Sequence, residues 1–332
     1  MKKDLNERLD LFVANARAIR SEFPLRETLA RKLAALAYSL EGREVDCAAV
    51  KECHSTIKSG AGIFSSFRGN LSVCVAAMLS LKENPREIFS RTSEVYESLK
   101  GEGFWPSDHL AIAAHEIASG AEPKDFARVI KRTRAFYEGM KARGFFRTGK
   151  DDYIFSAMLG LSDIDVQTGT ERIDVLYKKF KPSFRFGNGV QALTQVLVLS
   201  GDCEGAAGRV LELRDAMKMR GIRFDRYYTL PSLAVLSLLP SGVGEIVKEV
   251  SEAQAYLKTQ KGFGPWSVSK QALLLFSVAA VASVRASGAE GGAIKPSVSA
   301  GVASIIIAQQ AAMFAMFSAS VAASNAAAAG AR

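Results

Sequence analysis

The chain has 332 residues, 48% of them hydrophobic, and a formal net charge of +9. This length permits two domains and is sufficient for a large core. The excess positive charge is spread evenly along the chain, which argues against a specific nucleic-acid-binding surface, because such a surface concentrates lysine and arginine locally. Residues 1–12 include acidic side chains and lack the apolar core of a signal peptide.

The N-terminal part, residues 1–62, is predicted to be a helical cap. Residues 3–20, 25–40 and 48–58 have the pattern of three helices, with Pro24 at the first break and glycines after the third helix. This part does not match the repeat that follows it, as is usual for the terminal units of repeat arrays.

A pattern of about 40 residues recurs through residues 63–285. Each copy has a charged segment of helical period, then a corner with an aromatic or aliphatic residue, then a segment that is apolar almost all round. The corner residues, at intervals of 38 to 41 residues, are Phe64, Phe104, Phe145, Phe184, Ile222 and Phe263. A tyrosine precedes four of the corners by seven or eight residues, at Tyr96, Tyr137, Tyr177 and Tyr256. The apolar segments are residues 71–81, 110–118, 153–161, 190–199, 229–239 and 271–281.

Periodicity alone leaves the apolar segments ambiguous between helix and strand. Their length of 9–11 residues and their content of alanine, leucine and methionine favour helices that are covered on every side. One helix pair cannot bury itself, so the copies must stack, with apolar helices inside and charged helices outside. The predicted fold class is therefore all-α, as repeated helix pairs in an open α/α solenoid or a closed α/α toroid.

The C-terminal part follows a flexible break at residues 286–296. Residues 297–332 are rich in alanine and serine, carry no charge before Arg332, and are predicted to be helical. Such a length suits a membrane span. However, Gln309 and Gln310 lie in its middle, and alanine and serine give little driving force for insertion. We expect residues 297–324 to contact protein, with membrane contact as the alternative.

Four stretches together resemble a known family. They are FRGNLSVCVAAMLSL (residues 67–81), GEGFWPSDHLAIAA (101–114), KGFGPWS (261–267) and IIIAQQAAMFA (305–315). The chain is similar over about residues 1–320 to an uncharacterised bacterial family, number 4003 in the domain-of-unknown-function series. The resemblance implies a bacterial protein and no particular activity, because none is assigned to the family.

If the copies stack, every corner between a charged and an apolar helix lies on one rim. Guanidinium and indole groups would gather there beside free N–H groups at the helix N-termini, which favour anions. The ligand-binding residues predicted on this rim are Trp105, Arg147, Arg223, Arg226 and Trp266. In the alternative, the aromatic residues only pack the corners and the cations are solvated.

Polar residues inside the apolar segments are a second candidate site. If the array encloses a cavity, the predicted polar lining is His115, Glu116, Gln191, Gln195 and Gln271. In the alternative, neighbouring helices satisfy their hydrogen-bonding groups.

The sequence contains no complete catalytic or metal-binding motif that we could find. His115 and Glu116 could begin the zinc motif His-Glu-x-x-His, but Ser119 stands in the place of the second histidine. Asp151 and Asp152 lack the further acid of a terpene cyclase motif, and acids at helix starts are typical caps. We therefore predict no metal and no cofactor, and the catalytic residues stay unassigned.

These observations favour a helical-repeat binding or scaffold protein that uses the corner rim or a concave face. Its partner would be a protein or a small anionic ligand. The alternative is an α/α toroid enzyme that acts on a small or lipidic substrate in a central cavity. The four cysteines have no disulfide-like spacing, so we expect a cytoplasmic location, with membrane association through the tail as the alternative. The oligomeric state stays open.

Overall fold

The computed structural model describes residues 1–25, 28–60, 66–69, 72–144, 148–201, 203–224, 226–239 and 241–288. All regular structure in these residues is helical, which confirms the predicted all-α class. The α-helices are α1 (Lys3–Glu22), α2 (Thr28–Leu40), α3 (Cys47–Gly60), α4 (Ser72–Ser80), α5 (Pro85–Gly101), α6 (Asp108–Gly120), α7 (Phe126–Arg143), α8 (Tyr153–Leu161), α9 (Val166–Phe180), α10 (Gly187–Leu199), α11 (Cys203–Met219), α12 (Leu230–Leu238), α13 (Val243–Thr259) and α14 (Lys270–Gly288). The choice between solenoid and toroid stays a prediction.

The described residues form two compact units. Unit one contains residues 1–13, 138–148 and 164–288, and unit two contains residues 14–137 and 149–163, apart from the positions outside the description. Helices α1 and α7 each contribute to both units.

The apolar segments form helices that are covered on all sides. In α4, α8 and α12, every residue except the last is buried, as the absence of a polar face predicts. Helix α2 shares this burial, because residues 32–40 are all buried. Seven helices with outward polar faces alternate with these apolar helices from α1 onward, so the helix-pair pattern extends into the residues predicted as a cap.

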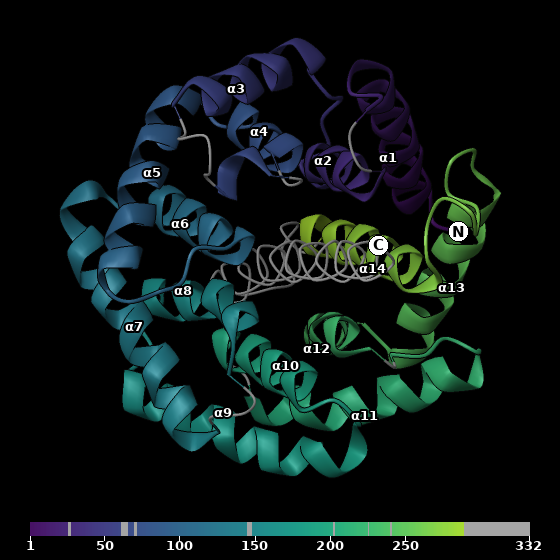
Figure 1. The fold of residues 1–332 in the computed structure, drawn as a ribbon. Coiled ribbons are helices and arrows are strands. Elements are labelled where there is room, and N and C mark those ends of the chain that lie inside the picture. The colour runs from purple at the N-terminus through teal and green to yellow at the C-terminus, as the bar shows by residue number, and fades with distance from the viewer. Residues whose placement is uncertain are drawn as a thin grey trace, which may run out of the picture. The chain divides into compact units, whose positions relative to one another are not determined.

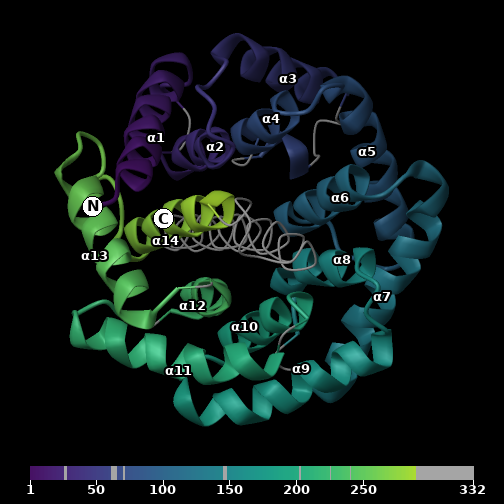
Figure 2. The same ribbon diagram turned by 180° about the vertical axis from the view of Figure 1, so that it is seen from behind.

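Unit one has two layers of helices. Helices α10, α12 and α14 pack in succession, and α9, α11 and α13 cover them, as Figure 1 shows and Figure 2 shows from behind. The first residues of α1 also pack in this unit. The ring of Phe12 lies 5.2 Å from that of Phe263 and 5.3 Å from that of Phe276, measured between centroids.

Unit two repeats this pairing. Helix α2 packs on α4, and α6 packs on α8, while α3 covers α4 and α5 covers α6. A cluster of rings joins the repeats: Tyr137 lies 5.4 Å from Phe104 and 5.3 Å from Tyr153 between centroids. The tyrosine in a charged helix therefore packs against the corner residue of the preceding copy. Tyr96 packs in a similar way on Phe67, three residues after the corner position 64, with ring centroids 5.1 Å apart.

The corners have a local cause in the sequence. Gly103, at φ 88°, ends α5, and the backbone N–H of Phe104 donates to the carbonyl of Leu99 at 3.2 Å. This Schellman turn needs a residue in the left-handed region, which glycine enters without strain. Gly221 and Ile222 repeat the arrangement after α11. A glycine followed by a buried apolar residue thus stops the charged helix and turns the chain toward the next apolar helix.

Residues 289–332 lie outside the described residues, and with them most of the predicted break and all of the predicted C-terminal helix. Among the helices that are described, none combines the length and apolar character required to cross a bilayer.

Candidate functional site: a basic pocket in unit one

Three segments of unit one surround a pocket. The first is the turn at residues 220–223, where the Schellman glycine Gly221 directs the chain away from α11. The second is a stripe of α13 that contains Ser251, Gln254 and Lys258. The third is the connection from α13 to α14, in which Gly264 accepts hydrogen bonds from the backbone N–H groups of Ser267 (2.9 Å) and Val268 (3.0 Å). The hydroxyl of Ser269 then caps α14 by accepting from the N–H of Ala272 at 3.1 Å.

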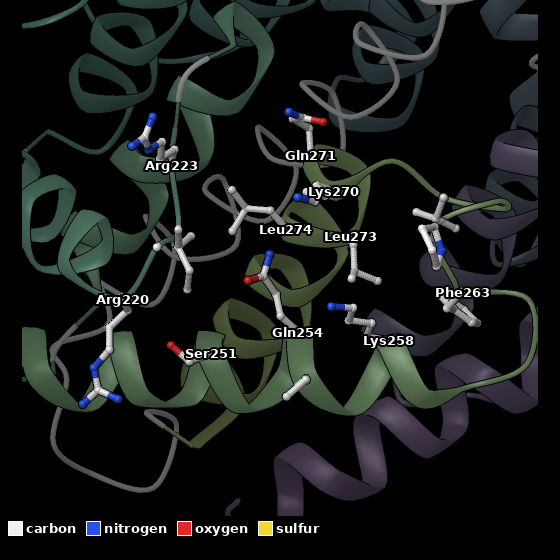
Figure 3. Close-up of a pocket in the computed structure, with 15 residues that line it drawn as sticks. Arg220, Arg223, Ser251, Gln254, Lys258, Phe263, Lys270, Gln271, Leu273 and Leu274 are labelled. Atoms are coloured by element: carbon white, nitrogen blue, oxygen red, sulfur yellow. The ribbon is translucent and has the colours of Figure 1, made fainter.

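The pocket has a volume of about 970 Å³. It is open to solvent and its floor is apolar, because the lining side chains Phe263, Val268, Leu273 and Leu274 are buried in the core beneath it. Figure 3 shows Gln254 projecting from α13 toward Leu274 and Lys270 of α14, with Arg223 on the side of the pocket away from Phe263.

The charged residues of the described lining are all positive. The described part of the lining holds four cations, Arg220, Arg223, Lys258 and Lys270, and no carboxylate. All four are exposed, and within the described chain none of their side chains forms an ion pair or a hydrogen bond. The amides of Gln254 and Gln271 also have no partner among the described residues, whereas the hydroxyl of Ser251 donates to the carbonyl of Val247 at 2.6 Å.

This arrangement can bind an anion that also carries an apolar part. Unpaired cations around a concave surface create a positive potential that attracts negative charge, and apolar walls favour the burial of carbon. The described lining offers no imidazole, thiol or carboxylate for acid–base or nucleophilic chemistry.

Comparison with known proteins identifies a family to which the chain is similar. The profile of a family described as "Protein of unknown function (DUF4003)" matches residues 17–311. The chain belongs to this family. No curated protein and no solved structure matches the chain. The DUF4003 match agrees with the resemblance that the four sequence stretches indicated, and it assigns no activity.

The described rim residues of this DUF4003 chain belong to both units. Arg223 lines the pocket, while Arg226 and Trp266 belong to the same unit and are exposed but outside the lining. Trp105 is in unit two, where it is 70% exposed and its backbone N–H donates to the hydroxyl of Tyr153 at 3.3 Å. Arg147 lies outside the described residues.

Of the residues predicted to line a cavity, Gln271 lines the pocket. Gln191 and Gln195 are fully buried in α10 and bond to neighbouring elements: the amide of Gln191 donates to the hydroxyl of Thr148 at 3.1 Å, and that of Gln195 lies 3.0 Å from the sulfur of Met140. The contact of Gln191 follows the alternative interpretation, in which the surrounding structure satisfies the amide.

His115 and Glu116 lie on α6 in unit two. His115 is buried, its Nε2 is 3.5 Å from the hydroxyl of Ser119, and its Nδ1 has no hydrogen-bond partner. Burial, together with the positive charge of Lys82, lowers the pKa of His115 to about 3. Burial raises the pKa of Glu116 to about 7, with Lys82 opposing part of the shift. The low-dielectric surroundings therefore favour the neutral form of both side chains.

The sequence prediction missed Arg220, Gln254 and Lys258. No polar residue of this stripe of α13 was singled out, although Ser251, Gln254 and Lys258 follow one another at three- and four-residue intervals. That spacing puts them on one stripe of the helix. This spacing was the one signal in the sequence for the α13 side of the pocket. Which residues from other segments face the stripe depends on how the helices pack.

Proposed function

We propose that this DUF4003 protein binds a small anionic ligand in the pocket bounded by α13, the start of α14 and the turn at residues 220–223. The single observation that carries the proposal is that the described lining has four cations, unpaired within the described chain, and no carboxylate. Elsewhere in unit one, cations do pair with acids. Arg285, for example, contacts Glu249 at 2.7 Å and Glu245 at 2.8 Å.

Electrostatics supports an anion as the occupant. Like charges placed around one space repel each other, and a bound anion removes that repulsion while gaining attraction to each cation. The side chains are already near solvent, so little desolvation opposes their interaction with a ligand. Guanidinium groups such as that of Arg223 can in addition bind phosphate or carboxylate through two parallel hydrogen bonds.

The size and floor of the pocket support a small molecule over a large partner. Ligand pockets have volumes of roughly 300–1,000 Å³, and about 970 Å³ is within this range. The buried floor of Leu273 and Leu274 would contact the carbon skeleton of the ligand. Since the described lining provides no paired acid and base, the activity that we propose is ligand binding.

The test is isothermal titration calorimetry with inorganic tripolyphosphate in a buffer free of divalent ions. We expect wild-type protein to bind and Arg223→Glu/Lys270→Glu to lose at least tenfold in affinity. Affinity should also fall as salt is raised, because ions screen exposed charges. The matched control is Arg172→Glu/Lys179→Glu, which makes the same charge change with two exposed residues of α9 outside the lining.

Two outcomes would contradict the proposal. If tripolyphosphate does not bind, the pocket is not a site for small polyanions. If both double variants weaken binding equally, the effect comes from net charge and not from the pocket.

A further inference from the structure

Trp266 is the most exposed large hydrophobic residue in the described chain, with a relative exposure of 101%. Its indole therefore makes no packing contact with the rest of the described protein. Indole rings carry a large apolar area and are ordinarily at least partly covered. A fully uncovered indole is available to another molecule.

The position of Trp266 links it to the basic pocket. Its chain neighbour Pro265 lines the pocket, and consecutive Cα atoms are about 3.8 Å apart. The lining resumes two residues later at Val268. Trp266 therefore stands at the margin of the pocket, although its side chain is not part of the lining.

The backbone presents Trp266 in a defined turn. The N–H of Ser267 donates to the carbonyl of Gly264 at 2.9 Å, so residues 264–267 form a turn with Pro265 in its second position and Trp266 in its third. Proline is favoured in the second position because its ring fixes φ near the value that the turn requires. The turn thus holds the backbone of Trp266 in place, while no packing contact restrains the indole from rotating toward the pocket.

We infer that the ligand is a nucleotide-like anion, whose negative groups bind the cations of the pocket and whose planar ring stacks on the indole of Trp266. The inference rests on the proposed function, since the cations supply the anchoring charge. A planar ring fits an indole better than an aliphatic chain does, because aromatic stacking adds to the burial of apolar area.

The positions of the four cations indicate how many negative groups the ligand carries. Arg220 and Arg223 come from the turn after α11, whereas Lys258 and Lys270 come from α13 and α14, so cations approach from three segments. A ligand with several negative groups, such as the phosphates of a nucleoside triphosphate, can contact more than one segment together. A monoanion can satisfy only part of this set.

The test compares ATP with inorganic tripolyphosphate, because the two share a triphosphate chain and only ATP has a base. Trp266→Ala should weaken ATP binding roughly tenfold, which is the size expected for loss of one base stack. The same variant should leave tripolyphosphate binding unchanged within about twofold. Trp266→Phe should restore most of the ATP affinity, because phenylalanine retains a flat ring.

Fluorescence gives a second measurement. The chain has two tryptophans, and Trp105→Phe leaves Trp266 as the sole indole emitter. In this variant, we expect ATP to quench the emission and tripolyphosphate to leave it nearly unchanged.

The outcomes separate this inference from the proposed function. If both ligands bind and Trp266→Ala weakens neither, the stacking inference is wrong and the anion site stands. If ATP binding depends on Trp266 but is insensitive to Arg223→Glu/Lys270→Glu, the basic pocket is not the anchor and the proposed function is wrong. If neither ligand binds, both are wrong.

Discussion

The ring of Phe12 lies edge-on against the ring of Phe263, with centroids 5.2 Å apart and planes at 74°. Phe12 belongs to the first helix, and Phe263 is the last corner residue of the repeat. Polar contacts reinforce this packing: the hydroxyl of Tyr256 donates to Asp10, and the amino terminus lies 3.3 Å from Glu252. The start of α1 therefore completes the core around α13 and α14.

We predict that Phe12→Ala destabilises the protein by about 3–5 kcal/mol, because the fully buried ring contacts two other rings and its removal leaves a cavity. Urea unfolding followed by circular dichroism would measure the loss. Phe12→Leu is the control and should retain most of the stability, since leucine fills much of the volume. A loss below about 1 kcal/mol for alanine would show that α1 does not stabilise this part of the fold.

A second prediction concerns Gly160, where α8 approaches α7 closely. A Cβ atom at this position would lie 2.9 Å from the backbone nitrogen of Thr133 and 3.0 Å from the carbonyl oxygen of Val129. Backbone atoms of a packed helix cannot easily shift, so we expect Gly160→Ala to cost about 2–3 kcal/mol.

The matched control is Gly208→Ala in α11, where a Cβ would meet nothing within 4 Å. Alanine there should stabilise the protein by up to about 1 kcal/mol, because glycine is the poorer helix former. Thermal unfolding of both variants would test the pair. Equal effects from the two substitutions would mean that helix propensity, and not the contact with α7, governs position 160.

The third prediction is a pH dependence that arises from Glu116. Burial raises its pKa from 4.5 to about 7 in the folded protein. The folded state therefore keeps a proton that the unfolded chain releases, and Glu116 lowers the free energy of unfolding as the pH rises from about 4.5 to about 7. Because the side chain is only partly covered, we expect this loss to be roughly 1–2 kcal/mol.

Glu116→Gln should remove this loss, so the variant should gain stability relative to wild type between pH 4.5 and pH 8. His115 acts in the opposite direction: its lowered pKa costs stability as the pH falls below about 6.5. Comparing variant with wild type isolates Glu116, because His115 is present in both. Urea unfolding at the two pH values would measure the difference, with Glu122→Gln as the control at an exposed position. Parallel pH profiles for wild type and Glu116→Gln would contradict the prediction.

Much of the helical architecture could be predicted from local sequence. The apolar segment predicted at residues 153–161 has the same limits as α8. The segment predicted at residues 229–239 is longer than α12 by one residue at each end. These segments were recognisable because they lack a polar face and because glycines end the charged helices before them. The ring that packs against each corner residue was not predictable, because such contacts join residues from different copies of the repeat, as Tyr137 and Phe104 do.

The pocket, too, has residues that the sequence identified and residues that it did not. Arg223 and Gln271 were identified as candidates from their places at a corner and at the start of an apolar helix, and both line the pocket. Gln254 and Lys258 were not identified, because a polar stripe on a charged helix has the same sequence pattern whether it faces solvent or a pocket.

The sequence by itself determined the helices, their approximate ends and the alternation of buried and half-exposed elements, because these depend on hydrophobic period and on backbone preferences within a few residues. Only the tertiary structure decided that α1 completes the core at Phe263 and that cations from three segments surround one space, with no acid in its described lining. The physical reason is that such contacts join residues far apart in the chain. They depend on how helix faces pack against each other, which local periodicity does not record.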